Sequence, residues 1–485
     1  MAVTPRKAAA VVILRDDETL LVRRNVKLAF MGGHHAFPGG ALDRNDDARH
    51  VVGAENSEQA LAMFAAAREV FEETGLMLAR GPQPDPEPLQ TARRAIHAHR
   101  ETFAQILDRF GLRIHAEDFA PAGVWITPGF SPARFHTQYF LCNYSGDFSG
   151  EVLEADGEIV GLDWLRAGEA RWRWHMGLLK LSTPVAVILR HLEQLRPPEL
   201  LDWLRRVPFR NPNMPDLFET RPGILILPVH SHTLPPAAYT NCVVIGEEQL
   251  YVVDPGATDP DEQEHLRTLL EHLAVLGGRV AAILLTHAHK DHAGAAPFLR
   301  TAFGAPIWCH EAAAREAGFA VDRFLSDGEV IEVAGNPPWR IRCLHTPGHN
   351  AGHLCFLEES TGSLLCGDMM ANPGTILISP DYGGDMTQYL ASLERLLQED
   401  VRFTVPGHGL PSFGESGRGE LRRLIAHRQA REARIRAAWD SGARTVDDLM
   451  EKAYDDVGRE TWPLAEQQLR AHLARLGLRI EGPPA

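Results

Sequence analysis

Short apolar runs alternate with longer amphipathic stretches along most of the chain, and this alternation predicts an α/β protein. In the first part, from residue 7 to about residue 205, the runs AAAVVIL, TLLVRR and TQYFLCNY have the length and residue types of strands. The polar letters RDDE between the first two runs predict a β-hairpin. The stretch ALAMFAAAREVFEETG instead has its apolar residues at helical spacing.

A second block of strands follows a break in this pattern. Prolines and asparagines accumulate in RRVPFRNPNMPDLFETRPG, where periodicity is lost, and this predicts a linker. Beyond it, CVVIG, LYVVD, RVAAILLT, SLLCGD and RFTVPGHG each predict a strand that ends in polar letters, which is a good place for a site. The remainder is mostly helical, with polar breaks at DSGARTVDD and near GRETWP. The expected domains are 1–206, 223–412 and 413–485, with a linker at 207–222.

Composition limits the class of protein. The chain has 485 residues, with 44% hydrophobic and 23% charged residues, which favours about three ordinary globular domains. No apolar run approaches the ~20 residues of a membrane span, and the first residues differ from a signal peptide, so we expect a cytoplasmic protein without a membrane partner. A net charge of −15 argues against nucleic-acid binding by the whole surface. Six cysteines without a CxxC pair argue against a disulfide framework and a structural zinc knuckle: Cys142, Cys242, Cys309, Cys343, Cys355 and Cys366.

The first candidate site is a cluster of carboxylates on one predicted helix. The helix is expected to begin near Asn56 or Ser57 and to end at Gly75. At 100° per residue, one face carries three carboxylates, Glu69, Glu72 and Glu73. Such carboxylates repel one another unless a cation lies among them, and oxygen donors suit Mg²⁺ or Mn²⁺. A solvated acidic face is the simpler alternative for three glutamates taken alone.

The string FPGGALD…AAAREVFEETGL resembles the Nudix box, which binds the metal of a diphosphate hydrolase with an α/β/α sandwich fold. The resemblance implies that Glu72 and Glu73 are metal ligands and that Glu69 is a ligand or the catalytic base. It also implies that Arg68 braces the carboxylates and that the glycine loop, Gly39 and Gly40, supports the site, with Gly39 giving a carbonyl oxygen.

The box departs from the usual spacing. Between Gly40 and Arg68 it contains the insertion RNDDARHVVGAENSEQ and is about a dozen residues too long, and Ala60 stands where the upstream glutamate is expected. Together with LLVRRN…FPGG and WITPGFSPARFHTQYF, the insertion resembles the Nudix branch that contains coenzyme A diphosphatases. A further acidic residue of that family corresponds to Glu158, with Glu151, Glu154 and Asp156 as alternatives.

The second candidate site is a cluster of histidines in LLTHAHKDHAG. The cluster follows a predicted strand and opens a predicted helix, and it contains His287, His289, Asp291 and His292. Imidazole and carboxylate are ligands that zinc prefers, and the four residues offer one pair for each of two ions. Buried imidazoles and carboxylates this dense need partners, which makes a purely structural role improbable.

The arrangement resembles the HxHxDH motif of the metallo-β-lactamase superfamily, whose fold is an αββα sandwich. TPGHNAGH, LLCGDMM, VPGHG and LYVVDPG follow the rest of that pattern and supply His349, Asp368, His408 and Asp254. The resemblance implies one zinc on His287, His289 and His349, a second on Asp291, His292 and His408, and Asp368 bridging them. Asp254 is expected to support the ligands, and Asp291 to take part in catalysis. Two such ions would lower the pKa of a shared water and so favour hydrolysis.

Other residues near these motifs have simpler interpretations. We expect four histidines to lie at the surface or to support ligands: His230, His232, His345 and His353. Cys366 is expected to pack as a small apolar strand residue. The helical tail resembles the winged-helix appendage of a β-lactamase-like protein group that includes endoribonucleases. Because its charges are balanced, we favour packing over the metal site rather than RNA binding.

The sequence therefore predicts a bifunctional hydrolase. A magnesium- or manganese-dependent Nudix diphosphatase, acting on coenzyme A or nucleotide diphosphate derivatives, is joined to a dizinc hydrolase of thioesters, lactones or phosphodiesters. Two alternatives remain: a non-catalytic Nudix half that senses a nucleotide, and a single-strand endoribonuclease that uses the tail. The sequence leaves the oligomeric state open.

Overall fold

The structure, a computed structural model, describes residues 4–28, 31–82, 84–127, 133–147, 150–153, 157–206, 217–235, 237–275, 278–335, 338–413 and 415–480. The chain forms two compact units, Met1–Pro222 and Gly223–Ala485. Of the predicted linker, residues 207–216 lie outside the described residues and 218–221 form a strand. The finer domain limits stay predictions. None of the helices within the described residues is long and apolar enough to cross a membrane.

The first unit contains ten strands and six α-helices within the described residues. The strands are β1 (Arg6–Arg15), β2 (Glu18–Arg24), β3 (His35–Ala36), β4 (Gly39–Ala41), β5 (Val51–Val52), β6 (Ile114–His115), β7 (Ala120–Ile126), β8 (Phe135–Asn143), β9 (Ile159–Arg166) and β10 (Phe218–Arg221). The helices are α1 (Ser57–Thr74), α2 (Pro86–His97), α3 (Phe103–Phe110), α4 (Ala167–His175), α5 (Thr183–Gln194) and α6 (Glu199–Arg206).

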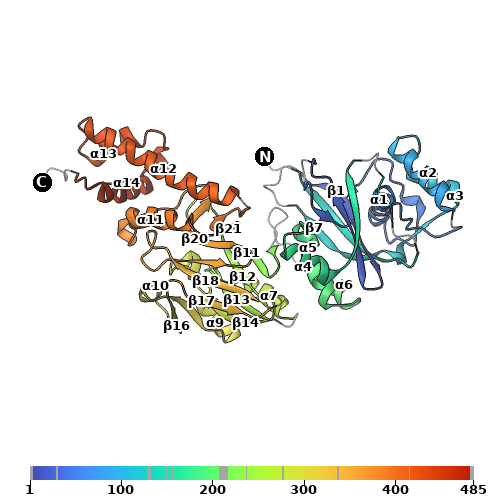
Figure 1. The fold of residues 1–485 in the computed structure, drawn as a ribbon, viewed down its shortest axis with the longest axis horizontal. Coiled ribbons are helices and arrows are strands. Elements are labelled where there is room, and N and C mark those ends of the chain that lie inside the picture. Colours follow the sequence, from blue (N-terminus) through green and yellow to red (C-terminus); the bar gives the residue numbers. More distant parts are fainter. Residues whose placement is uncertain are drawn as a thin grey trace. The chain divides into compact units, whose positions relative to one another are not determined.

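The main sheet of the first unit is covered by helices on both faces (Figure 1). Its order is β3-β2-β1-β8-β7, with β4 paired to β1 and β9 to β2. Side chains alternate across β1, so that Val11 lies in the core with α1 and α3 while Val12 lies in the core with α4, α5 and α6. The predicted hairpin is confirmed, because Arg15 pairs with Glu18 across a turn in which Asp16 has a φ of 54°. This is the α/β/α sandwich that the sequence predicted.

The second unit contains twelve strands within the described residues. They are β11 (Ile224–His230), β12 (Tyr239–Ile245), β13 (Gln249–Val253), β14 (Arg279–Leu284), β15 (Ile307–His310), β16 (Arg323–Leu325), β17 (Val330–Val333), β18 (Trp339–His345), β19 (Leu354–Glu358), β20 (Ser363–Asn372), β21 (Phe403–Gly409) and β22 (Ser412–Phe413). The helices are α7 (Pro260–Val275), α8 (Lys290–Ala293), α9 (Ala296–Phe303), α10 (Glu311–Glu316), the 3₁₀ turn η3 (Pro380–Tyr382), α11 (Met386–Leu396), α12 (Glu415–Asp440), α13 (Val446–Ala453), the 3₁₀ turn η4 (Arg459–Thr461) and α14 (Trp462–Leu476).

Two sheets form the centre of the second unit. One contains β11-β12-β13-β14-β15-β16 in that order, and the other contains β17-β18-β19-β20-β21-β22. Asn241 on β12 links them, because its Nδ2 donates to the carbonyl oxygens of Pro406 and Gly409 on β21, both at 2.9 Å. Helices α7 and α9 pack on the first sheet, and α11 and α12 share a core with the second (Figure 1). The predicted αββα sandwich is confirmed.

The tail is helical, as its pattern predicted. Helix α12 ends at Asp440 in the first predicted break, and η4 occupies the second. The three helices α12, α13 and α14 enclose a small core of their own around Leu449 and Leu469.

Candidate active sites

Four separate segments of the second unit supply its clustered histidines and aspartates. His287 and His289 follow β14, and the turn after them becomes α8, which carries Asp291 and His292. His349 lies between β18 and β19, while Asp368 and His408 lie within β20 and β21. The structure brings all seven side chains together, because β20 and β21 pair in parallel and β12 connects the two sheets.

The first triad consists of His287, His289 and His349, and one ring nitrogen of each lies close to the others. His289 Nδ1 lies 3.0 Å from His287 Nε2 and 2.9 Å from His349 Nε2. Two nitrogens bound to one tetrahedral zinc at 2.0–2.1 Å would lie about 3.3 Å apart. The three nitrogens therefore have nearly the spacing that a single ion imposes.

The second triad lies beside the first and shares a carboxylate with it. His292 Nε2 lies 3.3 Å from His408 Nε2, which lies 3.5 Å from Asp291 Oδ2. Asp368 turns Oδ1 toward His292 and His408, at 3.2 and 3.4 Å, and Oδ2 toward His349, at 3.4 Å. Within the described part of the chain, Asp368 Oδ1 is buried yet accepts no well-formed hydrogen bond. The donor set thus fits two divalent cations with Asp368 between them.

Hydrogen bonds on the far side of the rings hold the histidines in the required tautomer. His349 Nδ1 donates to Leu377 O at 2.9 Å, and His408 Nδ1 donates to Tyr239 O at 3.0 Å. His292 Nδ1 donates to Asp254 Oδ2 at 2.8 Å. In each ring Nε2 is left facing the centre, as a metal ligand requires.

Besides accepting the hydrogen bond from His292, Asp254 also binds Thr286, which follows the end of β14. Its Oδ1 accepts the Thr286 backbone N–H at 2.7 Å, and its Oδ2 accepts the Thr286 hydroxyl at 2.6 Å. Thr286 Oγ1 in turn lies 3.0 Å from His287 Nδ1. Asp254 has a φ of 50°, a backbone conformation that non-glycine residues rarely adopt. One buried carboxylate therefore supports a histidine from each triad.

Burial and neighbouring charges divide the imidazoles into two kinds. Burial and the adjacent histidines lower the pKa of His287 well below its ordinary value and that of His289 to about 4, so both are neutral near pH 7. Burial also disfavours charge on His292, but Asp368 and Asp254 outweigh it and raise the His292 pKa well above the ordinary value. Burial would raise the pKa of Asp368, yet His292 and His408 hold it well below its usual range. A cation would take the place of the proton on His292.

The remaining histidines divide by exposure. His353 is fully buried, and its Nε2 accepts the Asp368 backbone N–H at 3.0 Å. His230 and His232 are exposed beside Asp259. His345 stacks on His310 with ring centroids 4.2 Å apart. Cys366 is buried in the core of the second sheet.

The glutamates of the first unit lie on α1, which has the predicted bounds. Asn56 caps it through the Gln59 N–H, and Gly75 ends it with a left-handed φ of 78°. Arg68 lies among the carboxylates, with Nη1 at 2.7 Å from Glu69 Oε1 and 3.5 Å from Glu72 Oε1.

The glycine loop contacts the other side of the carboxylates. Gly39 donates its N–H to Glu73 Oε2 at 3.0 Å. A Cβ at Gly40 would lie 2.5 Å from the Glu69 carboxyl carbon, so only glycine fits without displacing that side chain. In the described residues, three donor atoms close enough for one ion are found only in the histidine and aspartate cluster, and not among these glutamates.

Glu73 is nevertheless buried, and Glu69 and Glu72 are partly buried, so the three do not form a fully solvated face. Burial raises the pKa of Glu69 to about 7 although Arg68 opposes this, and burial and Glu69 raise the pKa of Glu73 well above its ordinary value. A divalent cation would offset the cost of two buried carboxylates.

Of the alternative acidic residues, Glu158 is half-exposed and pairs with Arg24 at 3.0 Å, and Glu151 is exposed. Glu154 and Asp156 lie outside the described residues.

Three family models match this chain. The NUDIX domain matches residues 4–182, the metallo-beta-lactamase superfamily matches residues 235–408, and the beta-lactamase associated winged helix domain matches residues 445–478. The chain carries these three domains in that order. Nudix hydrolases and the metallo-β-lactamase superfamily are hydrolase families, so the predicted enzyme class is confirmed. The matches do not separate the coenzyme A diphosphatase branch from other Nudix proteins.

Individual relatives resemble parts of the chain. The lactamase-like protein notP of Aspergillus sp. (strain MF297-2) is 27% identical over 263 residues, covering 50% of this chain and 76% of that protein. An atrochrysone carboxyl ACP thioesterase of Claviceps purpurea is 26% identical over 267 residues, covering 53% of this chain and 79% of that protein. A solved NUDIX hydrolase from Alicyclobacillus acidocaldarius is 27% identical with a TM-score of 0.36, covering 41% of this chain and 96% of that chain.

The structure adds supporting residues that the sequence did not single out. In the Nudix domain, Asp46 from the insertion is buried and accepts from Arg68 Nε at 2.7 Å. In the metallo-β-lactamase domain, Thr286 and Leu377 O hold the imidazoles. An acidic pair inside the insertion was the one visible signal for Asp46, and a backbone carbonyl such as that of Leu377 leaves no signal in a sequence.

Proposed function

We propose that the metallo-β-lactamase domain is a hydrolase that works with two divalent cations, zinc being the best match to its donors. The observation that carries this proposal is Asp368, which turns one carboxylate oxygen toward each triad. Two cations held by these residues would supply Lewis acidity and would lower the pKa of a water near the substrate.

The residues around this site determine where a substrate enters. His287 and His292 are fully buried, while His289 and Asp291 are partly exposed. Thr233 also borders the site, with Oγ1 at 3.2 Å from His408 Nε2. The substrate therefore approaches from the side of His289 and Asp291, and the buried rings keep bulk water from the other side.

A thioester is the proposed substrate class. Two relatives of this chain, from Claviceps purpurea and Aspergillus fumigatus, are named atrochrysone carboxyl ACP thioesterase. The test is metal analysis of the purified full-length protein, followed by a panel of acyl thioesters, lactones and phosphodiesters. We expect two ions per chain from this domain and fastest turnover on a thioester. A protein that binds no ion at the triads would overturn the proposal.

For the Nudix domain we propose a Mg²⁺- or Mn²⁺-dependent diphosphatase that acts on nucleotide diphosphate derivatives, coenzyme A compounds among them. Its support is the set of the buried Glu73 and the partly buried Glu69 and Glu72 beside the glycine loop. Release of two phosphate-containing products from such a compound, dependent on added Mg²⁺ or Mn²⁺, is the expected result.

A specific observation favours a second candidate for the Nudix domain. The Arg68 guanidinium lies between Glu69 and Glu72, and this places a positive charge where a cation would have to bind. A domain of this kind could bind a nucleotide without cleaving it. Calorimetry that detects binding of a nucleotide diphosphate, together with chromatography that detects no product, would favour this sensor over the diphosphatase.

RNA is not the proposed substrate. Arginines of the described tail pair with nearby acids: Arg423 with Glu420, Arg431 and Arg434 with Asp456, and Arg470 with Glu466. Pairing of this kind leaves little positive charge to attract phosphates.

A further inference from the structure

Residues 373–379, between β20 and η3, orient one of the metal-facing imidazoles. Leu377 O accepts the hydrogen bond from His349 Nδ1. This bond leaves Nε2 as the metal-facing nitrogen and sets the direction of the ring. Whatever fixes the backbone at Leu377 therefore also fixes His349.

Two side chains of the tail hold the residue directly before Leu377. Arg428 on α12 donates through Nη2 to Ile376 O, and Gln468 on α14 donates through Nε2 to the same oxygen at 3.1 Å. Arg428 Nη1 also donates to Gln468 Oε1 at 2.6 Å. The two side chains and the Ile376 carbonyl group therefore form one hydrogen-bonded network. Arg428 is only 2% exposed, so this contact is a built feature of the interior.

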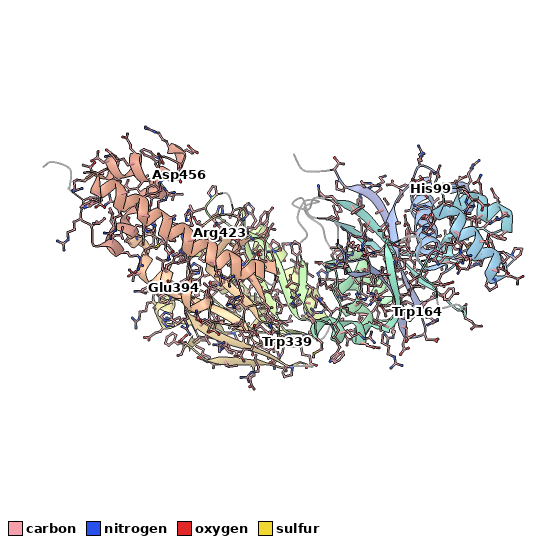
Figure 2. All side chains as sticks on the ribbon, turned by 45° about the horizontal axis from the view of Figure 1, so that its top comes forward. His99, Trp164, Trp339, Glu394, Arg423 and Asp456 are labelled. Carbon is pink, nitrogen blue, oxygen red and sulfur yellow. The ribbon has the colours of Figure 1, made fainter. Side chains whose placement is uncertain are left out.

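Neighbouring contacts strengthen the same connection. Arg423, labelled in Figure 2 on α12, donates through Nη2 to Gly374 O at 3.1 Å. The side chain of Ile376 is buried in the core that α11 and α12 share with the second sheet. The loop is thus held by its side chains and by its carbonyl groups.

Arg428 reaches the metal site by a second path through Tyr389 on α11. Its guanidinium carbon lies 5.5 Å from the centre of the Tyr389 ring. The Tyr389 hydroxyl donates to Met369 O at 2.9 Å, next to Asp368. A Cβ at Gly348 would lie 2.3 Å from Tyr389 N, so the Tyr389 backbone touches the residue before His349.

The tail offers a matched arginine without this connection. Arg431 is also buried on α12, donates to a backbone carbonyl, that of Ala453, and lies 4.2 Å from the ring of Tyr454. It also pairs with Asp456 at 2.8 Å. All of these partners belong to the tail, and none of them lies within residues 373–379.

We propose that Arg428 and Gln468 are positioning residues for His349, through which the winged-helix tail controls how tightly the first triad holds its ion. The inference rests on the proposed function, because it requires that the triads bind cations. It assigns to the tail a role in the metal centre that is independent of any nucleic acid.

The experiment is a Co²⁺ titration of metal-free, full-length protein, followed by visible absorption, on the wild type and four variants. Arg428→Met is expected to weaken the binding of one of two Co²⁺ ions by on the order of tenfold, as loss of a residue supporting a ligand does. Arg428→Lys keeps one donor and is expected to recover part of the loss. Gln468→Met weakens the same ion, and Arg431→Met leaves both unchanged.

The outcomes separate the two proposals. Wild-type protein that binds no Co²⁺ would sink the proposed function, and the inference with it. If the wild type binds two ions and Arg428→Met titrates like the wild type, only the positioning role is lost. If Arg428→Met and Arg431→Met weaken Co²⁺ binding equally, the tail stabilises the domain only in a general way and Arg428 has no specific positioning role. Thermal unfolding shows whether each variant is folded. If Arg428→Met is not folded, the Gln468→Met variant is used for the test instead, because Gln468 is only half-buried.

Discussion

The two candidate sites of this chain hold their donors in opposite ways. In the metallo-β-lactamase domain, seven candidate donors come from four segments of the chain. Three of the imidazoles also donate hydrogen bonds on their far sides, to Asp254, Leu377 O and Tyr239 O. In the Nudix domain, three donors come from one helix, and they are held from within by Arg68. In the first arrangement the nitrogen and oxygen atoms converge on one another, and in the second the Arg68 guanidinium already lies among the carboxylates.

This difference bears on what each site must do before it binds a metal ion. His287 and His289 are neutral near pH 7 and their nitrogens already converge, so binding requires little rearrangement. Glu69 has a pKa of about 7 and contacts Arg68, so an ion must displace a proton and part of a salt bridge. We therefore expect a tight, preformed site in one domain and a weaker site that forms with its ion and substrate in the other.

The largest effect should come from removing one donor at each site. His289→Ala removes the nitrogen that lies close to both other histidines of the first triad. Thioester turnover should fall roughly a thousandfold, which is equivalent to about 4 kcal/mol of transition-state stabilisation. Glu72→Gln should do the same to diphosphate turnover. Steady-state assays of both reactions on both variants measure the effects.

The comparison predicts that each variant spares the other reaction. Glu72→Gln should leave thioester hydrolysis within about twofold, since the carboxylate lies in a separate compact unit. If either variant abolishes both activities, the two domains do not hold independent sites. If Glu72→Gln changes nothing while nucleotide binding persists, the sensor role of the Nudix domain is favoured.

A smaller effect is expected from Asp254→Asn, which keeps the shape of the side chain and its rare backbone conformation but removes the charge. The amide holds the His292 Nδ1–H less strongly, so affinity for zinc should fall about 10- to 100-fold. Competition with a chromophoric chelator measures the affinity. Thr346→Val, which changes a partner of His353 rather than of a proposed ligand, is the control and should lose much less.

The sequence predicted the parts of both sites that chemistry requires to be particular residue types. Asp254 and Asp368 were predicted from the resemblance of LYVVDPG and LLCGDMM to the metallo-β-lactamase pattern. In the structure Asp254 directly follows β13, whereas β20 continues past Asp368 to Asn372. The bounds of α1 could be predicted because Asn56 and Gly75 are residues that end helices for local reasons.

What the sequence could not supply were contacts between distant segments. Nothing local in Arg428 or Gln468 distinguishes them from the many paired arginines and glutamines of the tail, and their partner is a main-chain oxygen. Likewise, the sequence predicted that the carbonyl oxygen of Gly39 contributes to the site. In the structure the Gly39 N–H donates a hydrogen bond to Glu73. Long-range hydrogen bonds to the backbone depend on how the whole fold closes, and residue type does not encode them.

The smallest of these effects concerns pH and distinguishes the two sites most directly. Below about pH 7 an ion must displace the Glu69 proton, and the raised pKa of Glu73 adds a second competing proton. Mn²⁺ affinity of the Nudix domain should therefore rise at least about tenfold per pH unit up to pH 7 and less steeply above it. The first zinc of the other domain should show no such rise above about pH 5, because the His289 pKa is about 4. Calorimetry in two buffers of different ionisation enthalpy counts the released protons. In Glu69→Gln the rise should be shallower, because the proton that competes at Glu69 is gone while that on Glu73 remains. A Mn²⁺ affinity that is flat between pH 5 and 8 in the wild type would mean that Arg68, and not the proton, controls entry of the cation.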